Sequence, residues 1–258
     1  MKVVIFAGGL GTRISEETDV RPKPMVEIGG KPILWHIMKI YEKYGHNDFI
    51  VCLGYKGYVI KEYFMNYYMH NSDVTIDLGT NKFDIHASKA ESFKITLVDT
   101  GLNTKTAGRL KAIRKYIKDE NFMLTYGDGV SDVDINKLTD FHQAHNKVAT
   151  VTAVQLGSRF GGMDLAANGE VVSFREKEKD ENKWINAGFF VLRPEVFDYL
   201  EGDMENVMWE EDPLEKLTLD GQLAAYRHTG YWQCMDALRD KIELESLWQN
   251  KQAKWKIW

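Results

Sequence analysis

A glycine-rich segment that directly follows a short apolar run near the start of the chain most constrains the fold. Residues 3–7, Val-Val-Ile-Phe-Ala, are continuously apolar, which is typical of a strand buried on both faces of a parallel sheet. Glycines then follow at positions 8, 9 and 11. Glycine lets backbone N–H groups approach an anion without a Cβ in the way. The pattern therefore predicts a buried strand that ends in an anion-binding turn.

Positive charges follow this glycine segment. Arg13 comes almost directly after it, and Arg21 and Lys23 lie in the sequence Arg-Pro-Lys-Pro. The two prolines hold that second stretch extended, because each restricts its own φ and disfavours helix in the residue before it. A glycine turn with fixed cations at the carboxyl end of a first strand suits a polyphosphate.

Two common glycine motifs do not fit. The phosphate-binding loop G-x-x-x-x-G-K-[ST] is absent from the sequence, and Ile14 occupies the third glycine position of the dinucleotide motif G-x-G-x-x-G. The glycines alone are equally compatible with a tight strand-to-helix turn that carries solvated charges.

A longer sequence motif favours the anion-binding turn over a plain strand-to-helix turn. Residues 7–13, Ala-Gly-Gly-Leu-Gly-Thr-Arg, followed by Pro-Lys-Pro-Met at 22–25, resemble the signature of sugar-nucleotide pyrophosphorylases. These nucleotidyltransferases join a sugar 1-phosphate to a nucleoside triphosphate. Within that family, the chain is most similar to the glucose-1-phosphate cytidylyltransferases. The similar segments span nearly the whole chain: residues 14–18, 25–38, 54–64, 126–129 and 236–241.

Length and composition agree with one large domain. A chain of 258 residues with 44% hydrophobic and 28% charged residues has ample material for a core, and we expect residues 1–258 to form a single nucleotidyltransferase domain. A formal net charge of −5 argues against nucleic-acid and anionic-membrane partners. The sequence shows neither a signal-peptide pattern nor an apolar stretch of about 20 residues, so we expect a cytoplasmic protein.

The two cysteines are expected to be free. Cys52 and Cys234 are far apart in sequence, form no C-x-x-C motif and each lie among apolar or aromatic residues. Buried thiols are therefore favoured over a disulfide or a metal site.

Strand and helix patterns alternate through much of the chain. A helix over 32–44, a strand over 49–53 and a helix over 57–68 predict parallel pairing with right-handed crossovers. We predict an α/β fold, a Rossmann-like domain with a mostly parallel central sheet flanked by helices. The other predicted elements are strands at 93–98, 122–126, 148–154, 171–175, 184–192 and 223–226, and helices at 104–117, 135–145, from 194, at 210–219 and up to about 248.

Residues 74–85 interrupt the alternation of strands and helices. Two alternating segments flank a Gly-Thr-Asn turn at 79–81, which predicts a smaller β excursion, a hairpin with one wet face. It is either a surface hairpin packed on its own helix or a contact between subunits. The resemblance implies a homo-oligomer, a hexamer, and so makes the second interpretation as good as the first.

The resemblance also implies the reaction. A cytidylyl group would pass from CTP to α-D-glucose 1-phosphate, which gives CDP-glucose and pyrophosphate. The attacking group is already a phosphate oxygen anion, so the protein must align two repelling anions and screen their charge rather than supply a strong base. The same reaction with UTP or dTTP remains open, as does a catalytically silent sugar-nucleotide sensor.

The family motif assigns roles to individual residues. Arg13 and Lys23 would be the catalytic cations, which bind the triphosphate and stabilise charge at the α-phosphoryl group. Lys177 would hold the sugar phosphate and Glu176 would accept hydrogen bonds from sugar hydroxyls, although Glu178 replaces the proline that often follows in the family. The predicted substrate-binding set is Phe6, Ala7, Gly8, Gly9, Leu10, Gly11, Thr12, Arg13, Lys23, Thr104, Arg109, Gly127, Glu176 and Lys177.

Two aspartates match the metal-binding positions of the family. Asp128 follows a predicted central strand in Gly-Asp-Gly, and Asp236 precedes the final helix. Mg²⁺, the expected cofactor, commonly takes one or two protein carboxylates and completes its shell with water and phosphate oxygens. Alone, Asp128 would be a turn residue and Asp236 a helix N-cap. His142 and His145 are expected to be solvated helix residues rather than metal ligands, and residues 251–258 a frayed surface tail.

Overall fold

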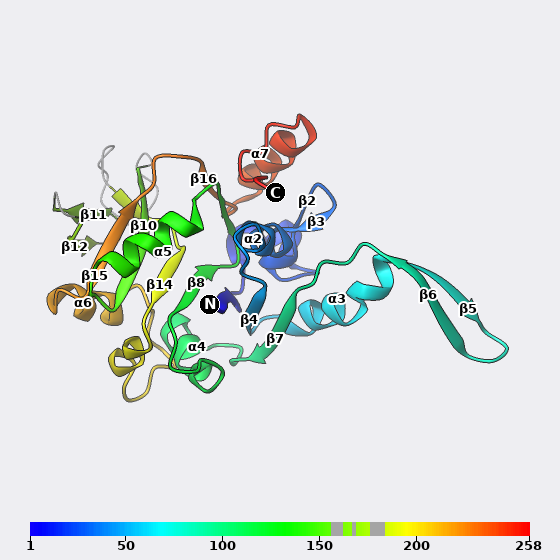
Figure 1. Ribbon diagram of the computed structural model, residues 1–258, viewed down its shortest axis with the longest axis horizontal. Coiled ribbons are helices and arrows are strands. Elements are labelled where there is room, and N and C mark those ends of the chain that lie inside the picture. The colour runs from blue at the N-terminus through cyan, green and yellow to red at the C-terminus, as the bar shows by residue number, and fades with distance from the viewer. Residues whose placement is uncertain (156–161, 167–168, 176–183) are drawn as a thin grey trace.

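The computed structural model describes residues 1–155, 162–166, 169–175 and 184–258, so Glu176 and Lys177 lie outside the described residues. Within these ranges, ten strands form a mixed sheet in the order β12-β11-β13-β10-β14-β8-β1-β4-β7, with β15 paired to β10 (Figure 1). Neighbours pair in parallel along the side that carries the first strand, namely β8 (Phe122–Tyr126), β1 (Val3–Ala7), β4 (Asp48–Leu53) and β7 (Lys94–Asp99).

The other side of the sheet contains antiparallel pairs. β14 pairs antiparallel with both β8 and β10, whereas β15 runs parallel to β10. The strands of this side are β14 (Phe190–Leu192), β10 (Ala149–Gln155), β13 (Trp184–Asn186), β11 (Gly162–Leu165), β12 (Val171–Arg175) and β15 (Leu223–Arg227).

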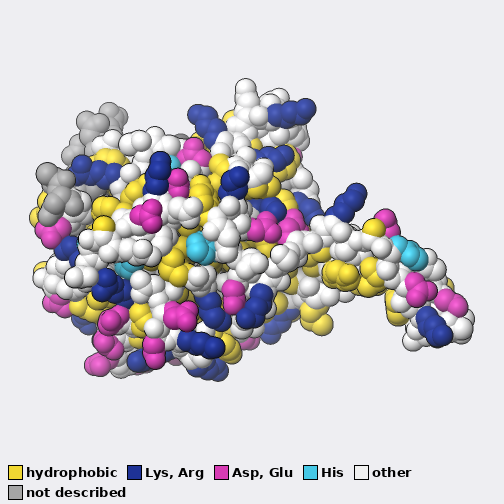
Figure 2. All heavy atoms as spheres, viewed as in Figure 1, with side chains coloured by type: hydrophobic (Ala, Val, Ile, Leu, Met, Phe, Trp, Pro, Cys, Tyr) yellow, Lys and Arg dark blue, Asp and Glu magenta, His cyan; other side chains and the backbone are white. Residues whose placement is uncertain are grey.

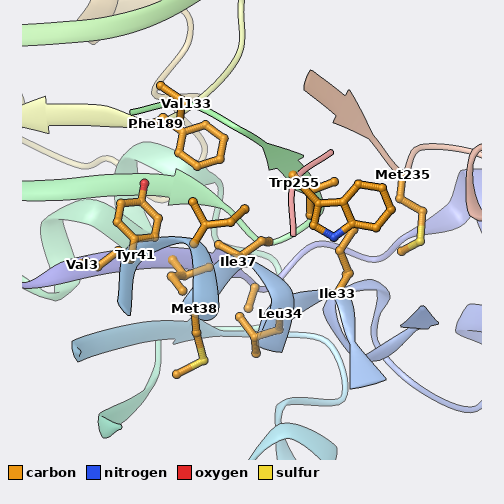
Figure 3. Close-up of a cluster of buried hydrophobic side chains, with 14 of the residues drawn as sticks. Val3, Ile33, Leu34, Ile37, Met38, Tyr41, Val133, Phe189, Met235 and Trp255 are labelled. Carbon is orange, nitrogen blue, oxygen red and sulfur yellow. The ribbon is translucent and has the colours of Figure 1, made fainter. Parts of the chain in front are cut away.

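Helices cover both faces of the sheet because successive strand residues point to opposite sides. Val3 and Ile5 of β1 belong to one buried cluster, and Val4 and Phe6 belong to the other. Side chains of α2 (Ile33–Glu42) belong to the first cluster (Figure 3). Side chains of α3 (Gly57–His70), α5 (Ile135–Ala144) and α7 (Leu238–Gln249) also join it. The second cluster receives α4 (Thr106–Ala112), α6 (Asp212–Leu219) and the 3₁₀ helix Pro194–Tyr199. The predicted α/β class, with a central sheet flanked by helices, is confirmed.

Shorter elements connect these layers. The 3₁₀ helices are Thr12–Ile14, Lys23–Met25 and Arg114–Tyr116, and α1 spans Ser15–Thr18. Two small antiparallel pairs join β2 (Glu27–Ile28) to β3 (Lys31–Pro32) and β9 (Gly129–Ser131) to β16 (Trp232–Cys234). Among the described residues, no helix combines the length and the apolar character that a membrane crossing requires.

Several predicted boundaries were wrong for local reasons. Pro32 belongs to β3, so α2 starts one residue later than predicted. The predicted helix 104–117 ends at Ala112 and continues as a 3₁₀ turn. The predicted strand 184–192 is two strands, because Gly188 and Phe189 adopt positive φ values of 73° and 50° between them. This corner lets the chain pair with β10 twice, once through β13 and once through β14.

The predicted hairpin is present but is uncovered on both faces. β5 (Ser72–Asp77) and β6 (Lys82–Ser88) project past the end of α3 and away from the body of the molecule (Figure 1). Ile76 pairs with Phe83 and Val74 with Ile85, so the alternation does gather apolar side chains on one face. Ile76 and Phe83 are nevertheless 49% and 55% exposed. The interpretation that the hairpin packs on its own helix was therefore wrong for this chain.

The histidine and cysteine side chains differ in their surroundings. His142 is fully buried, and its Nδ1 lies 2.8 Å from the hydroxyl of Thr150, which also contacts Nε2 of His145 at 2.9 Å. The expectation that His142 is solvated was wrong.

Cys52 is buried and Cys234 half-buried, and both are free thiols.

The carboxyl-terminal tail is not a frayed surface, contrary to expectation. Trp255 is 1% exposed, stacks on Trp248 and Tyr231, and lies within the first buried cluster (Figure 3). Its indole nitrogen lies 3.4 Å from Nδ1 of His36 on α2. Burial lowers the pKa of His36 to about 4, so its ring is neutral near pH 7. Aromatic burial therefore fixes the tail to α2.

We predict that Trp255→Ala lowers the free energy of unfolding by about 3–5 kcal/mol, because a buried indole is replaced by a cavity. Lys254→Ala removes an exposed neighbour and should change that free energy by less than about 0.5 kcal/mol. Denaturant unfolding of both variants measures the difference. Similar small effects for both substitutions would mean that the tail does not stay docked in solution.

Candidate active site

A cavity of about 730 Å³ opens at the carboxyl ends of β1 and β8, where open α/β sheets bind ligands. It receives residues from segments that are far apart in sequence, including Asn186, Met208 and Glu210 from the second half of the chain. The structure brings together on its wall every described residue that the sequence predicted for the site: Phe6, Ala7, Gly8, Gly9, Leu10, Gly11, Thr12, Arg13, Lys23, Thr104, Arg109, Gly127, Asp128 and Asp236. Glu176 and Lys177 lie outside the described residues.

Two cations and two carboxylates meet in this cavity. Nζ of Lys23 donates to Oδ2 of Asp128 at 2.7 Å and to Oδ1 of Asp236 at 3.0 Å. Nη1 of Arg13 donates to Oδ2 of the same Asp236 at 2.7 Å. The Lys23 side chain is 13% exposed, whereas that of Arg13 is 68% exposed. The cluster therefore joins one half-enclosed ammonium group to one open guanidinium group through Asp236.

The pKa values of this cluster reflect its pairing. Burial lowers the pKa of Lys23, but the charges of Asp128 and Asp236 and the hydrogen bond to Asp128 outweigh it and raise the pKa above its usual value. Burial raises the pKa of Asp236, and the charges and hydrogen bonds of Lys23 and Arg13 bring it below its usual value. The hydrogen bond to Asp236 and its charge raise the pKa of Arg13. Lys23, Arg13 and Asp236 are thus all ionised near pH 7.

Asp236 is not the N-cap of the final helix, which was the alternative to a functional role. α7 begins at Leu238, and the residue before it is Ala237. Oδ2 of Asp240 accepts from the backbone N–H groups of Asp236 and Ala237, at 3.0 and 2.8 Å. The carboxylate of Asp236 instead accepts from Arg13 and Lys23 and faces the cavity.

Arg109 lies beneath the glycine segment rather than projecting freely into the cavity. It is 4% exposed, and burial lowers its pKa, although a guanidinium group stays charged in proteins. Its Nη1 donates to the carbonyl oxygens of Leu53 and Gly101 at 2.8 and 2.9 Å and to Thr100 Oγ1 at 2.7 Å. Its Nη2 donates to the carbonyl oxygen of Gly8 at 3.0 Å. Arg109 therefore ties together the segments that follow β1, β4 and β7.

This guanidinium group explains two of the glycines. A Cβ at Gly8 would lie 2.2 Å from Nη1 of Arg109, and one at Gly54 would lie 2.6 Å from the carbonyl oxygen of Gly8 and 2.7 Å from Arg109. Gly9 is exposed, and a Cβ there would meet open space. Close packing thus requires glycine at position 8 but not at position 9.

A hydrogen-bonded group on another wall was missed by sequence reasoning. Glu210 accepts from the hydroxyl of Tyr126 at 2.6 Å and from that of Thr106 at 2.7 Å, and Asn186 donates to the same tyrosine oxygen at 3.1 Å. Burial, followed by the charge of Glu210, raises the pKa of Tyr126, which therefore stays protonated.

The sequence carries no signal for this group, because its pattern predicts that Glu210 begins an amphipathic helix. The helix instead begins at Asp212. The backbone of residues 204–209 bonds to that of 105–107, with Lys105 donating to Glu205 and Ala107 to Val207. This long-range pairing places Glu210 at the cavity.

The carboxylate pair fits a magnesium ion. One Lys23 nitrogen contacts both Asp128 and Asp236, so a single cation can reach both carboxylates. Within the described ranges, no cluster of three or more His, Cys, Asp or Glu side chains is arranged to hold a metal. Mg²⁺ binds through one or two carboxylates when water and phosphate oxygens supply the remaining ligands, and this donor set matches that requirement.

Comparisons with known proteins agree with the fold and identify similar enzymes. The family model for nucleotidyl transferases matches residues 2–248. Over the full length of both chains, the sequence is 56% identical to a glucose-1-phosphate cytidylyltransferase of Salmonella typhimurium. It is 46% identical, again over both full lengths, to a probable glucose-1-phosphate cytidylyltransferase of Bacillus subtilis. HddC from Yersinia pseudotuberculosis, solved in complex with GMP-PN, superposes with a TM-score of 0.76 at 25% identity, over 96% of this chain and 99% of that one.

The two neighbouring glycines provide a matched test of the packing around Arg109. Gly8→Ala should lower the free energy of unfolding by about 1–3 kcal/mol, because the added Cβ displaces a guanidinium group that hydrogen bonds hold in place. Gly9→Ala should leave that free energy within about 0.5 kcal/mol of the original. Urea unfolding of the two variants gives both values, and equal stability would contradict the role assigned to Arg109.

Proposed function

This chain belongs to the nucleotidyl transferase family, and we propose that it transfers a cytidylyl group from CTP to α-D-glucose 1-phosphate, giving CDP-glucose and pyrophosphate. Full-length identity of 56% to a protein named glucose-1-phosphate cytidylyltransferase supports the choice of substrates. The observation that carries the reaction class is the cluster of Arg13, Lys23, Asp128 and Asp236 beside the glycine segment, because it combines phosphate-binding cations with carboxylates suited to a metal.

The reaction is an in-line displacement at phosphorus. A phosphate oxygen of glucose 1-phosphate forms a new bond to the α-phosphorus of CTP, while the bond from that phosphorus to the bridging oxygen of the β-phosphate breaks. The electron pair of the broken bond leaves with pyrophosphate. No proton has to be removed from the nucleophile, so the site needs positioning and charge stabilisation rather than a general base.

The cations of the site match this requirement. Arg13 can form two parallel hydrogen bonds to a phosphate group, and Lys23 supplies a compact point charge. Backbone N–H groups of the exposed segment around Gly9 can approach the triphosphate, because a Cβ is absent there. We assign Lys177 to the phosphate group and Glu176 to the hydroxyl groups of the sugar on the strength of the family motif alone.

We also propose that Mg²⁺ is the cofactor and that Asp128 and Asp236 hold it. When bound, Mg²⁺ screens the repulsion between the two phosphate-bearing substrates. The two aspartates would supply its protein oxygen ligands. Asp240, which accepts from the backbone N–H of Asp236, and the pairing of β16 with β9 hold Asp236 in place.

A homo-oligomer is the third part of the proposal. The hairpin of β5 and β6 exposes Ile76, Phe83 and Ile85 on an arm that projects from the body (Figure 2). An apolar strand face that its own chain leaves uncovered is suited to burial against a second copy of that chain. The family resemblance leads us to expect a hexamer.

The substrate assignment is tested by measuring pyrophosphate release. With glucose 1-phosphate and Mg²⁺, turnover should be fastest with CTP among the nucleoside triphosphates. Equal or faster turnover with UTP or dTTP would contradict the base assignment and leave the reaction class intact. Absence of turnover with every triphosphate would favour a sugar-nucleotide sensor.

The assembly is tested by sedimentation velocity at micromolar concentration. The unmodified protein should sediment as an oligomer, and the double variant Ile76→Ser, Phe83→Ser should shift toward smaller species, because it removes a cross-strand apolar pair from the arm. Leu219→Ser, which changes a leucine that is 85% exposed elsewhere, is the matched control and should sediment unchanged. A monomeric unmodified protein would rule out a stable assembly.

A further inference from the structure

We propose that Lys23 is the resident counter-ion of the metal site: its ammonium group holds Asp128 and Asp236 together in the substrate-free protein and moves to a phosphate oxygen when the metal–nucleotide complex binds. This inference rests on the proposed function, because it concerns the same carboxylates. Nζ of Lys23 lies 2.7 Å from one aspartate and 3.0 Å from the other. It therefore lies in the region from which a single cation contacts both side chains.

The charge balance of the cluster explains why replacement of Lys23 by the metal ion would require bound nucleotide. Two aspartates are matched by Lys23 and Arg13, so these four side chains are neutral as a group. A divalent cation that joined them alone would either add two uncompensated positive charges or displace Lys23 into a partly enclosed site without a partner. A triphosphate supplies the negative charge that Lys23 and Arg13 can bind after they leave the aspartates.

The local structure allows Lys23 to move without a change in the backbone. Lys23 is the first residue of the 3₁₀ helix Lys23–Met25; Pro22 before it is extended, and Pro24 within it is buried. A Cβ built at Gly11 would lie 3.3 Å from Cβ of Lys23, so the base of the lysine side chain lies against the glycine segment. The ammonium group, at the end of four methylenes, can thus reach either the aspartates or an anion on that segment by side-chain rotation.

Binding of Mn²⁺ to the protein without nucleotide tests the inference, with electron paramagnetic resonance as the readout of free Mn²⁺. The unmodified protein should bind Mn²⁺ weakly. Lys23→Met and Lys23→Gln should each bind it about tenfold or more tightly, because the ammonium group that contacts both aspartates is gone while both carboxylates remain. Addition of Asp128→Asn to Lys23→Met should abolish the gain.

Controls separate this effect from a general change in charge. Lys31→Met removes a lysine that contacts Asn71 and lies over Trp35, away from the aspartates, and should leave Mn²⁺ binding unchanged. Near-ultraviolet circular dichroism should show that each variant is folded. Folded Lys23→Met and Lys23→Gln proteins whose Mn²⁺ affinity is unchanged or lower would overturn the proposal.

The same titration separates this inference from the proposed function. Because Mn²⁺ binding is measured without substrates, a gain in the lysine variants would support the counter-ion role even if pyrophosphate release were absent. Turnover with CTP by the unmodified protein, together with no gain in Mn²⁺ affinity, would leave the function intact and reject the counter-ion role. If the lysine variants do gain Mn²⁺ affinity, the Lys23→Met protein should also bind CTP in the presence of EDTA more weakly than the unmodified protein does.

Discussion

A single buried guanidinium group joins the carboxyl ends of three parallel strands, and the geometry of the active site depends on it. Arg109 donates hydrogen bonds to Gly8 after β1, to Leu53 at the end of β4 and to Gly101 after β7. The carbonyl oxygens of Leu53 and Gly8 also accept from the backbone N–H groups of Thr100 and Tyr55, and the cation adds a second, charge-assisted donor to each of them. The glycine segment accordingly has two functions: it exposes N–H groups to an anion at Gly9, and it leaves room for Arg109 at Gly8.

The charged cluster forms because the topology brings distant segments to this same edge. β1 and β8 are adjacent and parallel, so Asp128 emerges beside the glycine segment. β16 pairs with β9, Cys234 lies opposite Gly129, and the N–H of Met235 donates to the carbonyl oxygen of Asp128 at 2.9 Å. This pairing brings Asp236 to Asp128. Backbone hydrogen bonds thus bring together two aspartates that are far apart in sequence, and Lys23 then links their side chains.

The sequence predicted the features that depend on local pattern. The apolar run of β1 and the alternation in residues 74–85 each carry their signal within a few residues. The assignment of Asp128 and Asp236 came instead from the family resemblance, because alone they fit a turn residue and a helix cap. Features that depend on a distant partner were missed or misassigned. Glu210 reaches the cavity through pairing of 204–209 with 105–107, Asp240 takes over the capping of α7, and Trp255 finds its partners on α2 and near β16. Periodicity and propensity do not report such partners, because each segment also fits a simpler local interpretation.

The carboxyl-terminal tail is buried whereas the hairpin of β5 and β6 is exposed, although both carry apolar side chains, and the topology explains the difference. The tail follows α7, whose start is fixed at the active-site edge, and it therefore returns to α2, where Trp255 and Trp258 pack around His36. The hairpin is inserted between α3 and β7, and β7 is the edge strand of the sheet. A segment that leaves from a sheet edge points away from both buried clusters. Among the described residues, none covers its apolar face, which is the physical basis for proposing assembly at this arm.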